Sequence, residues 1–176
     1  MGVLAEYVRN EAEQLRANLI RRRENLEEWL GAISKLYDQL ESWIREADAG
    51  IQLLGTDRES TTETISEPRL GNYDVKTLWV VLGAGLGAAR QAWIVPKSRY
   101  VSAVIQPPGR EPRRADGIVQ INQRSVSEYY LFRWKSDAGD EWFIRGDKAW
   151  HASPNDNTVE PLDRDRFEAA MLRVLQ

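Results

Sequence analysis

The chain has 176 residues, of which 42% are hydrophobic and seven are tryptophan, so it can form one domain, or a helical arm with a small domain, and is too apolar to be wholly disordered. It has no cysteine and one histidine, which excludes disulfides, thiol nucleophiles and thiolate metal sites; we expect no metal, no cofactor and no catalytic residue. The net charge of −3 argues against a general nucleic-acid binder, although residues 77–136 hold nine basic and three acidic groups.

Neither a secretory signal nor a membrane span is indicated. The first 16 residues carry acidic groups early and contain no apolar core segment. The best candidate span, residues 78–89, is an apolar stretch of twelve residues, whereas a transmembrane helix needs about 20. We therefore expect a cytoplasmic protein without a membrane partner.

The first predicted element is a long amphipathic helix over residues 1–50, whose apolar residues repeat every seven positions. Position a holds Ala5, Ala12, Leu19, Leu26, Ile33, Leu40 and Ala47, and position d holds Val8, Leu15, Arg22, Trp29, Leu36 and Trp43. Arg22 is the one polar residue among them. Such a repeat is the seam of a left-handed coiled coil, which a lone helix cannot bury by itself.

The two halves of this helix differ at position e, which holds Arg9, Arg16 and Arg23 and then Leu30, Tyr37 and Ile44. In the first half, Glu11 at position g has the spacing to pair with Arg16 of a parallel second copy. In the second half the apolar face is wider, as in a helix that packs in a bundle or on its own domain. Arg22 marks either a polar layer that sets the register or the place where the seam opens.

We predict that this helix oligomerises the chain, as a homodimer or a higher oligomer. The residues expected to do so are Leu15, Leu19, Leu26, Trp29, Leu30, Ile33, Leu36, Leu40 and Trp43. Two alternatives stay open: the helix folds back on its own β-domain, or it holds another protein. Gly31 lies on the outer face, or else divides the helix in two.

Beyond Gly50, which suits a helix C-cap, residues 51–64 are polar and are predicted to form a linker. Residues 65–176 are predicted to form an antiparallel β-domain, a sandwich or half-barrel, closed by a helix over residues 163–175. Short strands are expected at 77–82, 91–95, 100–105 and 117–121, and a hairpin at 128–134 and 141–145. Asp163 is the expected N-cap of the closing helix. The fold class is thus α+β.

Three patterns resemble catalytic or cofactor motifs but lack their context. The glycines at 83–88 match a dinucleotide-binding turn, but no room follows for alternating strands and helices. His151 is a surface or cap residue on sequence grounds, although acids are nearby. Asp116 and Lys135 are separated as the acid and the lysine of a magnesium-dependent nuclease site are. Arg133, however, occupies the position at which such a site requires a second acidic residue.

The basic middle segment offers a different partner surface. Arg110, Arg113, Arg114, Arg133 and Lys135 are the residues that would contact a partner or a nucleic acid. Along residues 128–135 one alternating set (Tyr130, Phe132, Trp134) is expected to face the core and the other (Tyr129, Leu131, Arg133, Lys135) to face outward. We therefore expect a non-enzymatic interaction or assembly protein whose β-domain presents a surface to a partner. A small nucleic-acid-binding regulator that uses residues 77–136 is the alternative.

Overall fold

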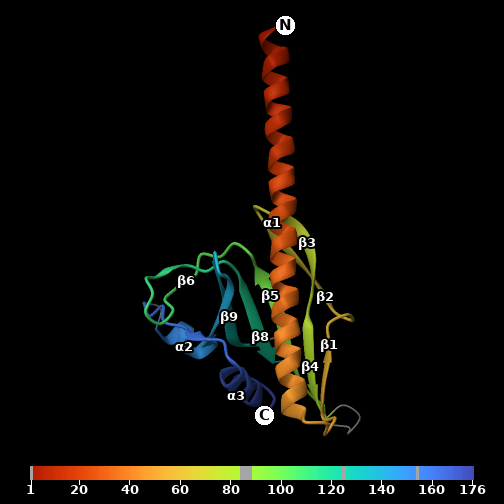
Figure 1. Ribbon diagram of the computed structural model, residues 1–176, viewed down its shortest axis with the longest axis vertical. Helices are drawn as coiled ribbons and strands as arrows, with labels where there is room; N and C mark the ends of the chain where they lie inside the picture. Colours follow the sequence, from red (N-terminus) through yellow and green to blue (C-terminus); the bar gives the residue numbers. More distant parts are fainter. Residues whose placement is uncertain (1, 84–88, 124–125, 154) are drawn as a thin grey trace.

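The computed structural model of the protein describes residues 2–83, 89–123, 126–153 and 155–176 (Figure 1). It confirms the α+β class, with a long N-terminal helix, a mostly antiparallel sheet domain and a short C-terminal helix. The helices are α1 (Val3–Asp48), α2 (Asp147–Ala152) and α3 (Arg164–Val174). The strands are β1 (Leu54–Asp57), β2 (Thr62–Glu67), β3 (Gly71–Lys76), β4 (Leu78–Leu82), β5 (Arg90–Ser98), β6 (Val104–Ile105), β7 (Arg113–Arg114), β8 (Ile118–Gln123), β9 (Val126–Ser136), β10 (Gly139–Gly146) and β11 (Glu160–Pro161).

One antiparallel sheet organises the domain, with strand order β1-β4-β5-β8-β9-β10-β11. β2 and β3 form a separate hairpin, and β6 pairs with β7. The predicted hairpin is present as β9 and β10, which pair on either side of a turn between Ser136 and Gly139. β5 continues through Pro96, where the sequence predicts a strand end, and its pairing with β8 shifts register there, because proline has no N–H to donate.

α1 is one unbroken helix of 46 residues, so Gly31 does not divide it. It ends at Asp48, close to the predicted end, and Ala49 follows with a left-handed φ of 44°. The Asp48 carboxylate accepts hydrogen bonds from the backbone N–H groups of residues 52–54. These bonds fix the turn that leads from the helix into β1.

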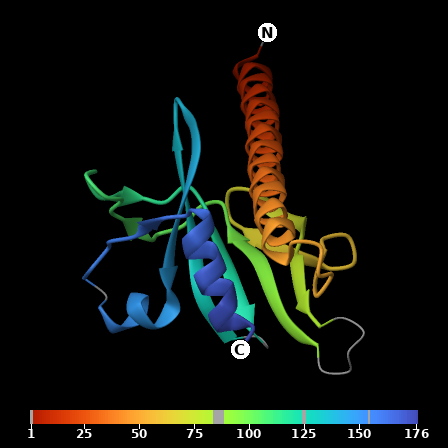
Figure 2. The same cartoon turned by 60° about the horizontal axis from the view of Figure 1, so that its bottom comes forward.

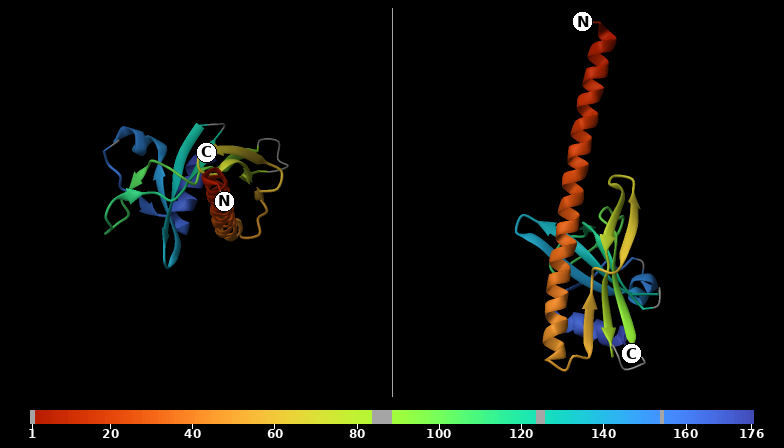
Figure 3. Two further views of the ribbon diagram at one scale, coloured as in Figure 1. Left: turned by 90° about the horizontal axis from the view of Figure 1, so that it is seen from above. Right: turned by 90° about the vertical axis from the view of Figure 1, so that its right-hand side faces the viewer.

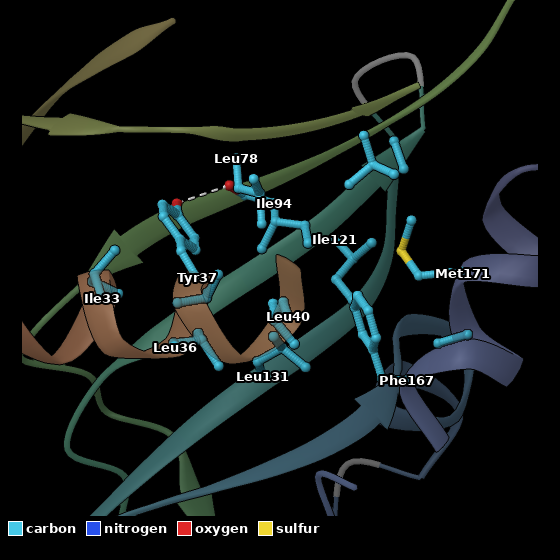
Figure 4. Close-up of a cluster of buried hydrophobic side chains, with 14 of the residues drawn as sticks. Ile33, Leu36, Tyr37, Leu40, Leu78, Ile94, Ile121, Leu131, Phe167 and Met171 are labelled. Carbon is cyan, nitrogen blue, oxygen red and sulfur yellow. Dashed lines mark hydrogen bonds between the residues drawn. The ribbon is translucent and has the colours of Figure 1, made fainter. Parts of the chain in front are cut away.

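The second half of α1 packs on one face of the sheet, whereas the first half extends beyond the domain (Figures 1 and 3). Trp29, Ala32, Ile33, Leu36, Tyr37, Leu40 and Ile44 are its buried residues. α3 covers the same face beside the end of α1 (Figure 2), and its N-cap is Asp163, as predicted. The Tyr37 hydroxyl donates to the carbonyl of Ile94 in β5 at 3.0 Å, which ties helix to sheet inside this core (Figure 4).

The opposite face of the sheet carries a second, smaller core. Its members are Ile105, Ala115, Phe132, Trp134, Phe143 and Val159. Both faces of β9 are therefore covered over most of the strand, and of the set predicted to face outward only Lys135 is exposed. Leu131 and Arg133, which the pattern places outside, are 0% and 1% exposed because α1 lies over them.

The structure also differs from the predicted linker at residues 51–64. This segment contains β1, which pairs with β4 from Leu54 to Asp57, and the beginning of β2. The predicted strand at 100–105 is reduced to β6, residues 104–105. Of the glycine pattern at 83–88, only Gly83 belongs to the described residues, so that prediction stays untested.

Candidate assembly surface

The first half of α1 carries apolar side chains that the rest of the chain leaves uncovered. We call residues 3–21 the arm, and its residues at positions a and d the arm stripe: Ala5, Val8, Ala12, Leu15 and Leu19. Val8, Leu15 and Leu19 are 55%, 60% and 62% exposed. Single exposed leucines are ordinary on a protein surface, but a continuous row on one helix face is typical of a contact site.

The arm stripe leads into the face that packs on the sheet, with the rotation of about 20° per heptad that a straight α-helix gives to a seven-residue repeat. The heptad continues without a break into Trp29, Ile33, Leu36 and Leu40, which are all buried. One helix face is thus divided into an inner part that the domain covers and an outer part that it does not cover.

The boundary between the two parts lies at Arg22. Its Nε donates a hydrogen bond to the carbonyl of Leu70 in the turn between β2 and β3. Gly71, the first residue of β3, has a φ of +74°, and a Cβ there would collide with the Arg22 guanidinium. The β2–β3 turn therefore packs against position d where the stripe ends.

The predicted oligomerisation residues fall into two groups. Leu15 and Leu19 are exposed on the arm. The other seven lie in the core of their own chain: Trp29, Ile33, Leu36 and Leu40 are buried, and Leu26, Leu30 and Trp43 are partly buried against them. These seven residues are covered by their own domain, so only the apolar residues of the arm remain available to a partner.

Below Arg22, a network of charges joins α1 to the sheet. The sequence suggests an exposed acid pair at Glu27 and Glu28, but Glu28 faces the buried guanidinium of Arg133, which also binds Asp140 at 2.8 Å. Burial raises the pKa of Glu28, but the hydrogen bond and charge of Arg133, together with Arg99 and Lys135, outweigh it and lower the pKa from 4.5 to about 2. No pattern in the sequence separates Glu28, which faces the sheet, from its exposed neighbour Glu27.

Most of the predicted basic contact residues have acidic partners. Arg110 forms a bidentate pair with Glu141, at 2.7 and 2.9 Å. Arg113 binds Asp116 at 2.9 Å, and its guanidinium stacks 3.8 Å from the Trp134 ring centroid. Arg133, which is buried, and Lys135, at 3.3 Å, both contact Glu28, and Arg114 is exposed on β7. These pairs neutralise much of the positive charge that the sequence shows.

The residues considered for catalysis do not converge on a common centre. His151 is exposed on α2, with its Nε2 3.4 Å from Asp147 and 3.5 Å from the Tyr130 hydroxyl. Asp116 accepts hydrogen bonds from Arg113 and from the backbone N–H of Lys135. Within the described parts of the chain, no three histidine and acidic side chains are grouped closely enough to hold a metal ion.

Comparisons with protein-family models, with curated proteins and with solved structures return no significant match for this chain. Among the helices that the structure describes, none combines the length and the apolar character that crossing a bilayer requires. The arm stripe is therefore the feature on which a functional proposal rests.

Proposed function

We propose that the chain is a non-enzymatic assembly protein, in which the arm pairs with the arm of a second copy. The supporting observation is the exposed stripe of Val8, Leu15 and Leu19 on a helix that extends beyond its own domain. A second copy is the occupant because the stripe keeps the a/d spacing by which two identical helices interlock. The β-domain is then a platform that the arm brings together in pairs.

The strength of the association follows from the size of the stripe. Burying a leucine or valine side chain stabilises a complex by about 1.5–3 kcal/mol, whereas bringing two molecules together costs about 4–15 kcal/mol. Two of the five stripe residues are alanines, which contribute little. We therefore expect a weak dimer, with a dissociation constant on the order of micromolar or above.

The test is the molar mass of the full chain in solution over a wide range of concentrations, measured by light scattering or sedimentation. We expect a reversible shift from monomer to dimer. Replacing Leu15 and Leu19 together by aspartate should abolish the shift, because charged groups would then lie in the seam. A chain that stays monomeric at every concentration would contradict the proposal.

Ile20→Asp supplies the matched control. Ile20 is 60% exposed, close to the 62% of its neighbour Leu19, but it lies at position b, outside the stripe. The two side chains are therefore almost equally exposed but lie on different faces of the helix. If the stripe is the contact, Ile20→Asp leaves the dissociation constant nearly unchanged, whereas Leu19→Asp raises it. Equal effects of both substitutions would point to general hydrophobicity instead.

The nucleic-acid alternative has one supporting observation. Arg69, Arg99 and Arg114 line a cavity of about 420 Å³, with Tyr100 among its other lining residues. Guanidinium groups around an aromatic ring suit phosphates and bases. A gel shift with single-stranded RNA and DNA at low salt tests it, and its dependence on Arg110, Arg113 and Arg114 tests the predicted contact residues. Absence of a shift at low salt would rule this alternative out.

A further inference from the structure

We infer that two arms pair in antiparallel orientation, with the two β-domains at opposite ends of the pair. This inference rests on the proposed self-association and adds to it an orientation and a register. It follows from two features of α1: the side of the helix on which the domain lies, and the order of small and large residues along the stripe.

The position of the domain excludes the parallel arrangement. α1 is continuous and its inner part, from Trp29 onward, is covered by the sheet on the stripe side. A parallel partner helix seated on the stripe would continue into the β2–β3 turn, which packs against Arg22, and then into the sheet (Figure 3). By symmetry, both domains would also lie between the two helices and occupy the same space.

The antiparallel arrangement keeps the two sheets apart and leaves only the first turn of each helix near the β2–β3 turn of the other copy. With one copy turned end for end, its helix leaves the stripe in the direction away from the first domain. Each domain then stands at its own end of the paired arms. The longest dimension of such a dimer is about 100 Å at 1.5 Å per helical residue, against about 70 Å for two helices side by side in parallel.

The side chains of the arm stripe also complement one another in size when the second copy runs in the opposite direction. In an antiparallel pair, position a of one helix meets position d of the other. The pairs within the arm stripe are Ala12 with Leu15 and Val8 with Leu19, whereas Ala5 falls opposite Arg22, beside the β2–β3 turn that already contacts it. Each layer sets a smaller side chain against a larger one, which helps the layers to interlock. A shift of one heptad in one direction leaves Leu19 unpaired, and a shift in the other requires Trp29, which is buried in its own chain.

The charges on the arm oppose this orientation, but weakly. The antiparallel arrangement brings Arg9 next to Arg16 of the second copy, whereas the parallel arrangement pairs Glu11 with Arg16. Exposed like-charged neighbours weaken an association by about fivefold at most for two such contacts. Two folded domains cannot occupy the same space, so the position of the domain outweighs this charge repulsion in setting the orientation of the arms.

Introduced thiols test the orientation, because the chain has no cysteine of its own. The full-length Val8→Cys and Leu19→Cys variants are treated separately, and then as a mixture in which one carries a tag, with a thiol crosslinker that spans no more than about 10 Å. In the antiparallel pair, two copies of residue 8 lie about 16 Å apart along the axis, so each variant alone gives little product. The mixture should give the mixed dimer.

Each outcome is decisive. Efficient crosslinking of both variants, each alone, would show parallel arms and overturn the orientation, while the proposed self-association would stand. Efficient crosslinking of only one variant alone would show an antiparallel pair shifted by one heptad and would overturn the register. A dimer in solution with no mixed product would overturn the register. A monomeric unmodified chain would overturn the proposed function, and this inference with it. Melting temperatures of both variants confirm that the fold is intact.

Arg16→Glu provides a second readout without crosslinking. In the antiparallel pair, this substitution turns two repulsive contacts with Arg9 into attractive ones, so the dissociation constant should fall by roughly fivefold to tenfold at low salt. In the parallel pair it sets Glu11 against a new glutamate, and the dissociation constant should rise. A rise would overturn the antiparallel assignment.

Discussion

At the scale of single residues, Glu28 holds the junction between α1 and the sheet. Its carboxylate faces Arg133, which is 1% exposed, and lies 3.4 Å from the Arg99 Nε and 3.3 Å from the Lys135 Nζ. The pKa of Glu28 is lowered from 4.5 to about 2 in the folded chain. Because the folded state binds this proton more weakly than the unfolded state, ionised Glu28 stabilises the fold at neutral pH. That contribution is lost as the pH falls from about 4.5 toward 2.

We predict that Glu28→Gln lowers the free energy of unfolding at pH 7 by about 2 kcal/mol, less than for a fully buried pair because Glu28 is partly exposed and Arg133 keeps Asp140. The variant should also lose less stability than the unmodified chain between pH 5 and pH 2. Urea unfolding followed at several pH values measures both effects. Glu27→Gln is the control, since Glu27 pairs with Arg23 on an exposed face and should contribute less than about 0.5 kcal/mol. An unchanged pH profile in Glu28→Gln would contradict the prediction.

At the scale of elements, the sequence predicts where helices form better than what they contact. The heptad predicts α1, and the apolar positions of α3 predict its buried face, because both follow from periodicity alone. The widening of the stripe at Leu30 and Tyr37 indicates a broad partner, yet a sheet and a helix bundle bury such a face equally well. The sequence therefore leaves open whether this half packs on another subunit or on its own domain.

The elements that the sequence misses are those whose apolar pattern is short or interrupted. β2 and β3 contain few apolar residues, and the place of this hairpin in the fold depends on contacts distant in sequence, since the Glu67 carboxylate at the end of β2 accepts hydrogen bonds from the backbone N–H groups of Arg99 and Tyr100. Arg133 misleads for a related reason. A charged residue in an alternating strand predicts an outward face, and only the position of Glu28 on α1 explains its burial. The exposed part of the candidate site, Leu15 and Leu19, could be read from the heptad directly.

A pair of substitutions separates the two parts of α1. Leu40 is 0% exposed in the domain core, so Leu40→Ala should lower the free energy of unfolding by about 2–5 kcal/mol. Leu19→Ala, at the same heptad position on the arm, should change the unfolding of the monomer by less than about 0.5 kcal/mol. Thermal and urea unfolding at a concentration below the dimer range measure both. Equal losses would mean that the arm is packed against the domain in solution.

At the scale of the whole molecule, the arm and the domain are separable at Arg22. The core beneath α1 includes residues of this helix only from Leu26 onward, and the core on the opposite face of the sheet contains none of them. A chain that begins at Arg22 should therefore unfold as a monomer, with a free energy of unfolding within about 1 kcal/mol of that of the full chain, and should show no concentration-dependent mass.

A chain that begins at residue 56 loses the whole buried face of α1 and should not fold, because the sheet surface under Leu36 and Leu40 would be exposed to water. Circular dichroism and light scattering on the two shortened chains check this. A folded protein beginning at residue 56 would show that the second half of α1 is not the core element that holds this face of the sheet.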